Sequence, residues 1–434
     1  MATKAEIVSK DTIKPFSPTP NHLRDFKISL LDQLAPSSNY VPVVLFYTAS
    51  DVSVLGNDIK MISDKLKSSL SNVLTLYYPF CGILKDNSTV ECNDEGVLYI
   101  ESKVPKELSN ILKNPQAHEI NELFPFDLYN PEVDHKKPIR NMAVQLNEFS
   151  CGGIGLGVCF SHKIADASTM SSFLNAWSAK ARGDSNIVAP QMEAALLFPP
   201  MNIEIDITRG VAGHKNIVTK RFIFNGKNIS KLRDKLGCLK PTRVEAVTAL
   251  IWKSAIEAAK ASSGEKTRHA CMVSHAVNIC SRMDSSLLRQ MLGNLWVLAV
   301  SPLVEVEEVV GLDDLAEIVR KTVKKVDADY VKMLQGDELP MVLEAFEESR
   351  KMVTEKGIPC YSFSSWTRFD LYNVDFGWGK PTWVCTIGLP IQNVVIFLAT
   401  KNGDGIEAWI TLTEHDMVEF ERNPQLLEFA SFDF

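Results

Sequence analysis

The sequence lacks the features that mark several large classes of protein. No apolar run approaches the roughly 20 residues that a helix needs to cross a bilayer, and residues 1–15 lack the apolar core of a secretory signal peptide. Lys and Arg number 46 against 53 Asp and Glu, a formal net charge of -7, and neither a basic stripe nor an RNA-binding motif is present. We therefore expect no membrane partner and no nucleic acid partner, and a cytoplasmic location.

Cysteine pairs are also missing. The nine cysteines are scattered, and none belongs to a CxxC pair, which argues against a disulfide framework and against a zinc site. Cys151, Cys159 and Cys271 lie in apolar runs, where buried reduced thiols are expected. The cysteine pattern thus predicts no metal site and a reducing compartment.

The motifs of three common enzyme classes are absent or incomplete. The chain contains no GxSxG elbow of a serine hydrolase and no P-loop. Residues 153–157 (GIGLG) are similar to the start of a dinucleotide-binding loop, but they lie inside an apolar strand and the third glycine is not at the fingerprint spacing. These rival enzyme classes therefore receive little support.

What is present is an ordinary globular composition, with 45% hydrophobic and 23% charged residues over 434 positions. This length favours two domains over one. Between the two halves, residues 189–213 lose periodicity and contain three prolines, as is typical of a long crossover. We predict an N-terminal domain at residues 1–190, a crossover loop at 191–215 and a C-terminal domain at 216–434.

Strand-like and helix-like segments alternate in both halves, and no internal repeat is visible. The predicted strands are Tyr40–Tyr47, Met142–Leu146, Gly153–Phe160, Val218–Phe224, Asn393–Thr400 and Ile406–Leu412. The predicted helices are Ile59–Leu76, Lys227–Leu236, Arg243–Ala261 and Leu312–Leu334. The pattern indicates a mixed α/β protein.

The most informative segment is 151–170, CGGIGLGVCFSHKIADASTM. Its apolar residues up to Phe160 predict a buried strand, and helical spacing resumes near Ala167. His162 therefore lies between two rigid elements, where a neutral imidazole can act as a general base. A carboxylate four residues after a histidine also occurs by chance, so a buried structural histidine with Asp166 as a helix cap is an equally good interpretation.

A second motif, VDFGWGKP, occupies residues 374–381. Gly377 and Gly379 flank Trp378, which indicates a backbone with unusual dihedral angles or close approach. Asp375 can bind local amides or an arginine. Taken alone, this segment predicts a structural loop, because a Gly-Trp-Gly turn carries no chemistry of its own.

The two motifs together are more specific than either one. HxxxD in mid-chain and DFGWG near the C-terminus, at this separation, resemble the plant BAHD family of acyl-CoA-dependent acyltransferases. The chain is closest in character to vinorine synthase-like alkaloid acetyltransferases and acylsugar acyltransferases. Further similar stretches cover essentially the whole chain: Ile13–Pro20 (IKPFSPTP), Ser29–Leu34 (SLLDQL), Leu76–Leu84 (LYYPFCGIL), Cys92–Val97 (CNDEGV), Val244–Lys253 (VEAVTALIWK) and the pair Gly293-Asn294.

The resemblance implies a chloramphenicol acetyltransferase-like α/β fold of two domains, each a mixed β-sheet flanked by helices, with the active site between them. It implies acyl-CoA as a co-substrate, no permanently bound cofactor, a small-molecule hydroxyl acceptor and a monomer. His162 would take the proton from the hydroxyl as its oxygen attacks the thioester. Asp166 would be a supporting residue. Asp375, which is sometimes labelled catalytic, is expected to have a structural role together with Gly377, Trp378 and Gly379.

The segment 277–282 (VNICSR) departs from the family pattern. In the family an arginine from this segment forms an ion pair with the aspartate of HxxxD, which makes Arg282 the candidate partner of Asp166. Relatives commonly carry an arginine at position 280 as well, and this chain has Cys280 there. If the pairing arginine belonged at 280, Asp166 would lack its partner.

The acyl acceptor is left open by the sequence. An alkaloid alcohol is favoured by the resemblance, with a sugar ester or a terpenoid alcohol as alternatives. A catalytically inactive ligand-binding paralogue is the rival from another class of protein; Cys280 favours it, and the intact His162 and Asp166 argue against it. Candidates for binding the phosphates of coenzyme A are Lys253, Lys380 and Arg368, which the sequence does not rank.

Overall fold

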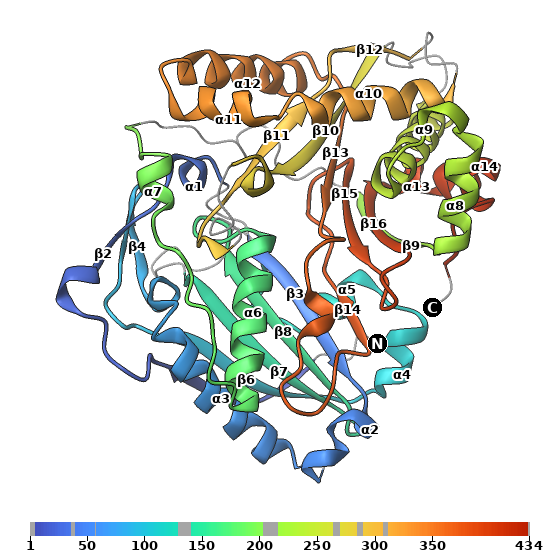
Figure 1. Cartoon of the computed structure of the whole chain (residues 1–434). Coiled ribbons are helices and arrows are strands. Elements are labelled where there is room, and N and C mark those ends of the chain that lie inside the picture. The colour runs from blue at the N-terminus through green and yellow to red at the C-terminus, as the bar shows by residue number, and fades with distance from the viewer. Residues whose placement is uncertain are drawn as a thin grey trace. The chain divides into compact units, whose positions relative to one another are not determined.

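The computed structural model describes residues 5–35, 40–56, 58–128, 140–202, 216–263, 270–283, 290–306 and 311–432. They form two compact units, each built around a β-sheet with flanking helices (Figure 1). Unit 1 consists of Met1–Asp206, Ser285–Leu295 and Phe369–Ile387, and unit 2 of Ile207–Asp284, Trp296–Arg368 and Gly388–Phe434. The expected α/β class with two sheet-containing domains is confirmed.

The division of the chain differs from the predicted one in two respects. The segment Ser285–Leu295, predicted as part of the C-terminal domain, belongs to unit 1. The segment Phe369–Ile387, which contains DFGWG, belongs to unit 1 and not to the C-terminal unit. The reason is strand pairing: β14 (Trp383–Cys385) is hydrogen-bonded antiparallel to β3 (Tyr40–Tyr47). Much of the predicted crossover, residues 203–215, lies outside the described residues.

Unit 1 is centred on a six-stranded sheet in the order β1-β6-β7-β8-β3-β14, in which only β6 and β7 run parallel. Besides β3 and β14 its strands are β1 (Glu6–Ile13), β6 (Val97–Val104), β7 (Met142–Phe149) and β8 (Ile154–Ser161). A small sheet contains β2 (Asp25–Lys27), β5 (Thr89–Glu91) and β4 (Ile83–Asp86). The α-helices of this unit are α1 (Leu30–Leu34), α2 (Ala49–Val52), α3 (Ile59–Leu74), α4 (Leu108–Lys113), α5 (Ala117–Asn121), α6 (Ala167–Arg182) and α7 (Ala194–Leu197).

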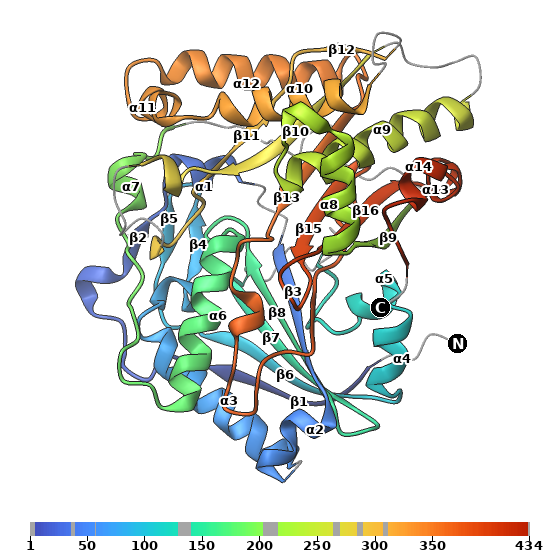
Figure 2. The ribbon, with the colours of Figure 1, turned by 45° about the vertical axis from the view of Figure 1, so that its right-hand side comes forward.

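Helices α3 and α6 lie side by side against the sheet of unit 1 (Figure 1, Figure 2). The Trp177 indole on α6 donates to the carbonyl of Leu66 and to the Ser69 hydroxyl on α3. Below them, β8 is buried along its whole length, as its apolar composition predicts. A Cβ at Gly157 would lie 2.2 Å from the carbonyl oxygen of Leu123, so only glycine fits at this point of the strand. The strand that precedes His162 is therefore rigidly packed.

Unit 2 contains a seven-stranded sheet in the order β11-β10-β13-β15-β16-β9, with β12 paired to β10. Its strands are β9 (Ile217–Phe224), β10 (Ala270–Asn278), β11 (Trp296–Val300), β12 (Val304–Glu305), β13 (Cys360–Ser365), β15 (Val394–Ala399) and β16 (Ile406–Thr413). Its α-helices are α8 (Gly226–Lys235), α9 (Arg243–Ser263), α10 (Leu312–Lys324), α11 (Ala328–Gln335), α12 (Leu339–Thr354), α13 (Glu414–Glu421) and α14 (Pro424–Leu427).

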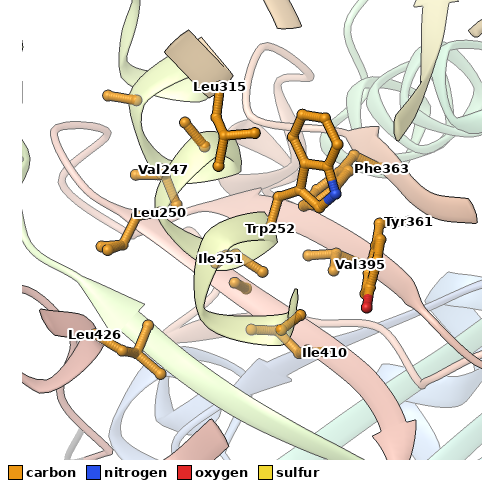
Figure 3. Packing of buried hydrophobic residues seen from close by; sticks show 14 of the residues in the cluster. Val247, Leu250, Ile251, Trp252, Leu315, Tyr361, Phe363, Val395, Ile410 and Leu426 are labelled. Atoms are coloured by element: carbon orange, nitrogen blue, oxygen red, sulfur yellow. The ribbon is translucent and has the colours of Figure 1, made fainter. Parts of the chain in front are cut away.

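The core of unit 2 forms around α9. Figure 3 shows Trp252 and its neighbours on this helix facing Phe363 and Val395 of the sheet, with Leu315 of α10 on the other side. Trp252 and Leu315 are fully buried. The 3.6-residue spacing of apolar side chains along α9 therefore serves to cover the sheet.

The predicted long helix Leu312–Leu334 is wrong as a single element, because it consists of α10 and α11. Asp327 interrupts it by accepting a hydrogen bond from the Tyr330 backbone N–H and thereby capping α11. An aspartate side chain competes for such N–H groups and favours a new helix start.

No helix among the described residues is both long enough and apolar enough to cross a membrane.

Candidate functional site

The imidazole of His162 lies at the point where a buried strand meets a helix. His162 comes directly after β8, and Asp166 is the N-cap residue of α6, which begins at Ala167 as predicted. Lys163, Ile164 and the two residues that follow are buried, whereas His162 keeps part of its surface exposed. The histidine is thus fixed at its backbone and still accessible at its side chain.

The ring of His162 contacts a residue far along the chain. Its Nδ1 lies 3.0 Å from Oδ1 of Asn294. The Asn294 Nδ2 group in turn donates to the backbone carbonyl of His162 at 2.6 Å. Burial lowers the pKa of His162, and hydrogen bonds of the ring with its own backbone and with Asn294 act in the opposite direction. The net direction favours a neutral imidazole, the form that a general base requires.

Asn294 is held by a buried carboxylate, that of Asp32. The Asp32 Oδ1 atom accepts from the backbone N–H of Asn294 at 2.7 Å and from its Nδ2 at 2.8 Å. The other oxygen, Oδ2, accepts from the backbone N–H and the hydroxyl of Ser29 and completes a capping box at the start of α1. Burial raises the pKa of Asp32, while these hydrogen bonds lower it. A chain of contacts therefore runs from Asp32 through Asn294 to His162.

Asp166 is supported by backbone amides. Its Oδ1 accepts from the Thr169 N–H at 2.8 Å and its Oδ2 from the Leu295 N–H at 3.2 Å. Burial raises the pKa of Asp166 to about 6, although the two amide hydrogen bonds lower it and the charge of Asp32 raises it further. The Thr169 hydroxyl also donates to the carbonyl of Gly293 at 2.8 Å. Asp166 thus caps α6 and ties it to the segment that carries Asn294.

Arg282 has partners that differ from the predicted one. It belongs to the short 3-10 helix η6 (Cys280–Arg282), and its guanidinium donates to the carbonyls of Val326 and Asn278 within unit 2. The two Asp166 oxygens are used by amides of unit 1. Within unit 1 the support of Asp166 comes from backbone N–H groups, and the ion pair between Asp166 and Arg282 stays a prediction.

The DFGWG loop has its own set of contacts in unit 1. Asp375 Oδ1 accepts from the N–H groups of Gly377 and Gly379 at 2.7 and 2.9 Å. Both glycines have positive φ, 102° and 105°, which a side chain would strain. The buried Trp378 ring packs edge-on against Tyr47, whose hydroxyl donates to the carbonyl of Val374. Asp375 shapes this loop, and its part in activity stays a prediction.

Sequence reasoning missed Asp32, Asn294 and Thr169 as members of this site. Asp32 lies within SLLDQL and Asn294 within the Gly-Asn pair, both recognised only as stretches similar to the family. Asn294 is 262 positions from Asp32 and 132 from His162. The available signal was the Ser-x-x-Asp capping pattern at Ser29, which predicts the helix start but not the second partner of its carboxylate.

No group of three or more His, Cys, Asp or Glu side chains in the described part of the chain is placed to hold a metal ion. The predicted phosphate-binding cations have separate contacts. Lys380 donates to Asn373 in unit 1, Lys253 lies 4.0 Å from Glu257 in unit 2, and Arg368 is exposed in unit 2. Within each unit, these contacts do not distinguish one of them as a phosphate ligand.

Comparison with known proteins matches the whole chain. A family model described as "Transferase family" matches residues 3–427. Stemmadenine O-acetyltransferase of Catharanthus roseus is 37% identical, over 96% of this chain and 96% of its own. Limonoid 1-O-acetyltransferase of Citrus sinensis is 35% identical, over 98% of each chain. The crystal structure of vinorine synthase superposes with a TM-score of 0.85 at 33% identity, covering 99% of both chains.

Proposed function

The chain belongs to the Transferase family, the BAHD acyltransferases, and from that premise we propose that it transfers an acetyl or short acyl group from acyl-CoA to a hydroxyl of a plant specialised metabolite, with His162 as the general base. One observation carries the proposed role: the His162 ring is held through Nδ1 by Asn294 at the end of a rigid strand. An imidazole fixed in this way, with a lowered pKa, is neutral near pH 7 and able to accept a proton.

The reaction follows from that proton transfer. Nε2 of His162 takes the proton of the acceptor hydroxyl while the hydroxyl oxygen attacks the thioester carbonyl. The tetrahedral oxyanion collapses, the bond to sulfur breaks, and the thiolate of coenzyme A receives the proton from the imidazolium. The acyl group moves directly from sulfur to oxygen, so no acyl-enzyme is formed and acyl-CoA is the only co-substrate required.

Asp166, Asp375 and the glycines of the DFGWG loop serve this chemistry indirectly. Asp166 fixes the start of α6, and Asp375 fixes the backbone of the DFGWG loop by binding two amides. Neither carboxylate is needed to move a proton in the scheme above. Arg282 is assigned to the local structure of unit 2, where its contacts lie.

An alkaloid alcohol is the favoured acceptor, since stemmadenine O-acetyltransferase is among the similar proteins. A terpenoid alcohol is supported by the limonoid 1-O-acetyltransferase at nearly the same identity, and an acylated sugar stays a further alternative. We also propose a monomer in the cytoplasm. All nine cysteines, each among the described residues, carry free thiols, which suits a reducing compartment.

The test is release of coenzyme A from the purified protein. Acetyl-CoA and short branched acyl-CoA donors are incubated with panels of alkaloid, limonoid and sugar-ester alcohols, and free thiol and product mass are recorded together. An acyl mass increment that requires both substrates is the expected result. An inactive binding paralogue would retain acyl-CoA or acceptor binding in calorimetry and release no coenzyme A with any pair, which would exclude the proposal.

A further inference from the structure

The orientation of the Asn294 amide is determined by its neighbours. Its Nδ2 group faces two acceptors, the His162 carbonyl at 2.6 Å and Asp32 Oδ1 at 2.8 Å. If the amide were turned over, its oxygen would face the same two oxygens, with no hydrogen between them. The amide therefore directs Oδ1 towards the His162 ring.

This orientation fixes the hydrogen on the imidazole. An amide oxygen only accepts hydrogen bonds, so the 3.0 Å contact requires His162 Nδ1 to donate. In a neutral ring the hydrogen then resides on Nδ1, and the lone pair resides on Nε2. Nε2 is the nitrogen that must accept the hydroxyl proton in acyl transfer.

Asp32 is the group that enforces this arrangement. Among the described residues, its oxygens accept four hydrogen bonds, from the backbone and side chain of Asn294 and from the backbone and side chain of Ser29. The neighbouring Gly293 has φ of 126°, and a Cβ there would lie 3.2 Å from both carboxylate oxygens. The backbone at Gly293 thus allows the close approach of Asn294 to Asp32.

We propose that Asp32 is a positioning residue for His162: its carboxylate orients the Asn294 amide, the amide holds the hydrogen on Nδ1, and the lone pair of the general base is thereby placed on Nε2. The catalytic consequence rests on the proposed acyl transfer. The tautomer itself is a property of the resting protein and is measured independently of any substrate.

The chain offers a matched control for a purely structural role of Asp32. Asp51 occupies the same position in a second capping box, at the start of α2, where its Oδ2 accepts from the N–H and the hydroxyl of Thr48. Its further partner is the hydroxyl of Thr382 at 3.0 Å. Asp32 and Asp51 therefore both belong to a capping box, and of the two only Asp32 also binds Asn294.

The primary experiment is nitrogen NMR of protein labelled at histidine, in which the His162 signals are identified by their loss in His162→Ala. The expected wild-type spectrum shows His162 neutral, with hydrogen on Nδ1. Asp32→Asn places an NH₂ group against the donors of either Ser29 or Asn294 and removes the negative charge, so the amide of Asn294 is held less firmly in its orientation. We expect hydrogen to redistribute between Nδ1 and Nε2, and kcat to fall about 10-fold or more with a smaller change in KM for acyl-CoA.

A second pair of variants covers the possibility that Asp32→Asn does not fold. Asn294→Ala removes the amide but keeps the backbone N–H that binds Asp32. Its control is Asn141→Ala, which removes another buried amide, one that donates to the carbonyls of Pro79 and Gly82. We expect the tautomer and kcat to change in Asn294→Ala, and only stability to change in Asn141→Ala and Asp51→Asn.

Two outcomes overturn the inference. Hydrogen on Nε2 of wild-type His162 would contradict it directly, whatever the variants do. An unchanged His162 tautomer in a folded Asp32→Asn or Asn294→Ala protein would reduce Asp32 to a helix cap. The expected tautomer without turnover of any substrate pair would instead count against the proposed function and leave the role of Asp32 intact.

Discussion

Two histidines, one in each unit, show how differently the same side chain can be used. His275 lies in the middle of β10, is 4% exposed, and contacts the Thr248 hydroxyl through Nε2 at 3.2 Å. Its ring stacks on Phe363 with 5.3 Å between centroids. His162 lies beyond the end of β8, is partly exposed, and uses Nδ1 for its contact with Asn294.

The pKa alone does not separate the two. Burial lowers the pKa of His275 to about 4, with the charge of Glu245 acting in the opposite direction, and burial lowers the pKa of His162 as well. Both rings are therefore neutral at pH 7. The two histidines differ in which ring nitrogen contacts the protein and in their position relative to the strand. A general base is therefore recognised by its geometry before its pKa.

The largest expected difference is in turnover. His162→Ala should lower kcat by about 100-fold or more, because a positioned general base contributes at least that much. His275→Phe should leave kcat within about 3-fold of the parent, since the ring stacks in the core of unit 2. Steady-state kinetics of both folded variants measure this directly. Equal losses of kcat would remove the distinction between the two histidines.

The pH dependence of the unfolding free energy tests the comparison at His275. Its folded pKa near 4 lies below the unfolded value of 6.5, so its stabilising contribution is complete above pH 6.5 and is lost as the pH falls towards 4. The shift corresponds to roughly 3 kcal/mol. Urea unfolding of wild type and His275→Phe between pH 4 and 7 should show a flatter pH dependence in the variant; parallel curves would contradict the assignment.

Asp166 should contribute a pH dependence of stability that is opposite in sign to that of His275. Its folded pKa of about 6 lies above the usual 3.8, so its contribution to stability is complete below pH 3.8 and is lost as the pH rises through 6. The expected amplitude is about 2 to 3 kcal/mol. Asp166→Asn should remove this dependence while a capping oxygen is kept, as urea unfolding over the same pH range can measure. A stability difference that does not vary with pH would mean that Asp166 titrates normally.

The smallest effect is expected at the DFGWG loop, where the chemistry of His162 is not involved. Asp375→Ala removes the acceptor of two amides and should cost about 1 to 3 kcal/mol of unfolding free energy. Asp375→Asn can present its carbonyl oxygen at the position of Oδ1, so we expect a smaller loss. The pH–rate profile should keep its His162 limb in both variants. Loss of that limb in a stable Asp375→Asn protein would place Asp375 in proton transfer.

Local patterns in the sequence were sufficient for much of the fold and for the first member of the site. Apolar composition predicted β3 and β8, and the resumption of helical spacing predicted the start of α6, which together locate His162 between rigid elements. These features depend on neighbouring residues only. The break between α10 and α11 was missed because the apolar periodicity continues through Asp327, whose cap is a single hydrogen bond.

The contacts between the residues of the site could not be predicted from local sequence patterns. Asp32 and Asn294 carry no local mark of their contact, which depends on how β8, α1 and residues 290–295 fold together in unit 1. The predicted partner of Asp166 was Arg282, and that prediction rested on the family resemblance. The two backbone amides that Asp166 binds were not predicted, because backbone donors are available at any sequence position and leave no mark in the sequence.

The pairing of β14 with β3 has a consequence for the order in which the protein can assemble on the ribosome. Phe46 of β3 pairs with Trp383, and Asp32 of α1 binds Asn294, so β3 and α1 must wait for residues made several hundred positions later. At roughly 5 to 20 residues per second, this delay lasts tens of seconds. During it, the apolar edge of β3 is uncovered in the nascent chain and suited to binding by a chaperone.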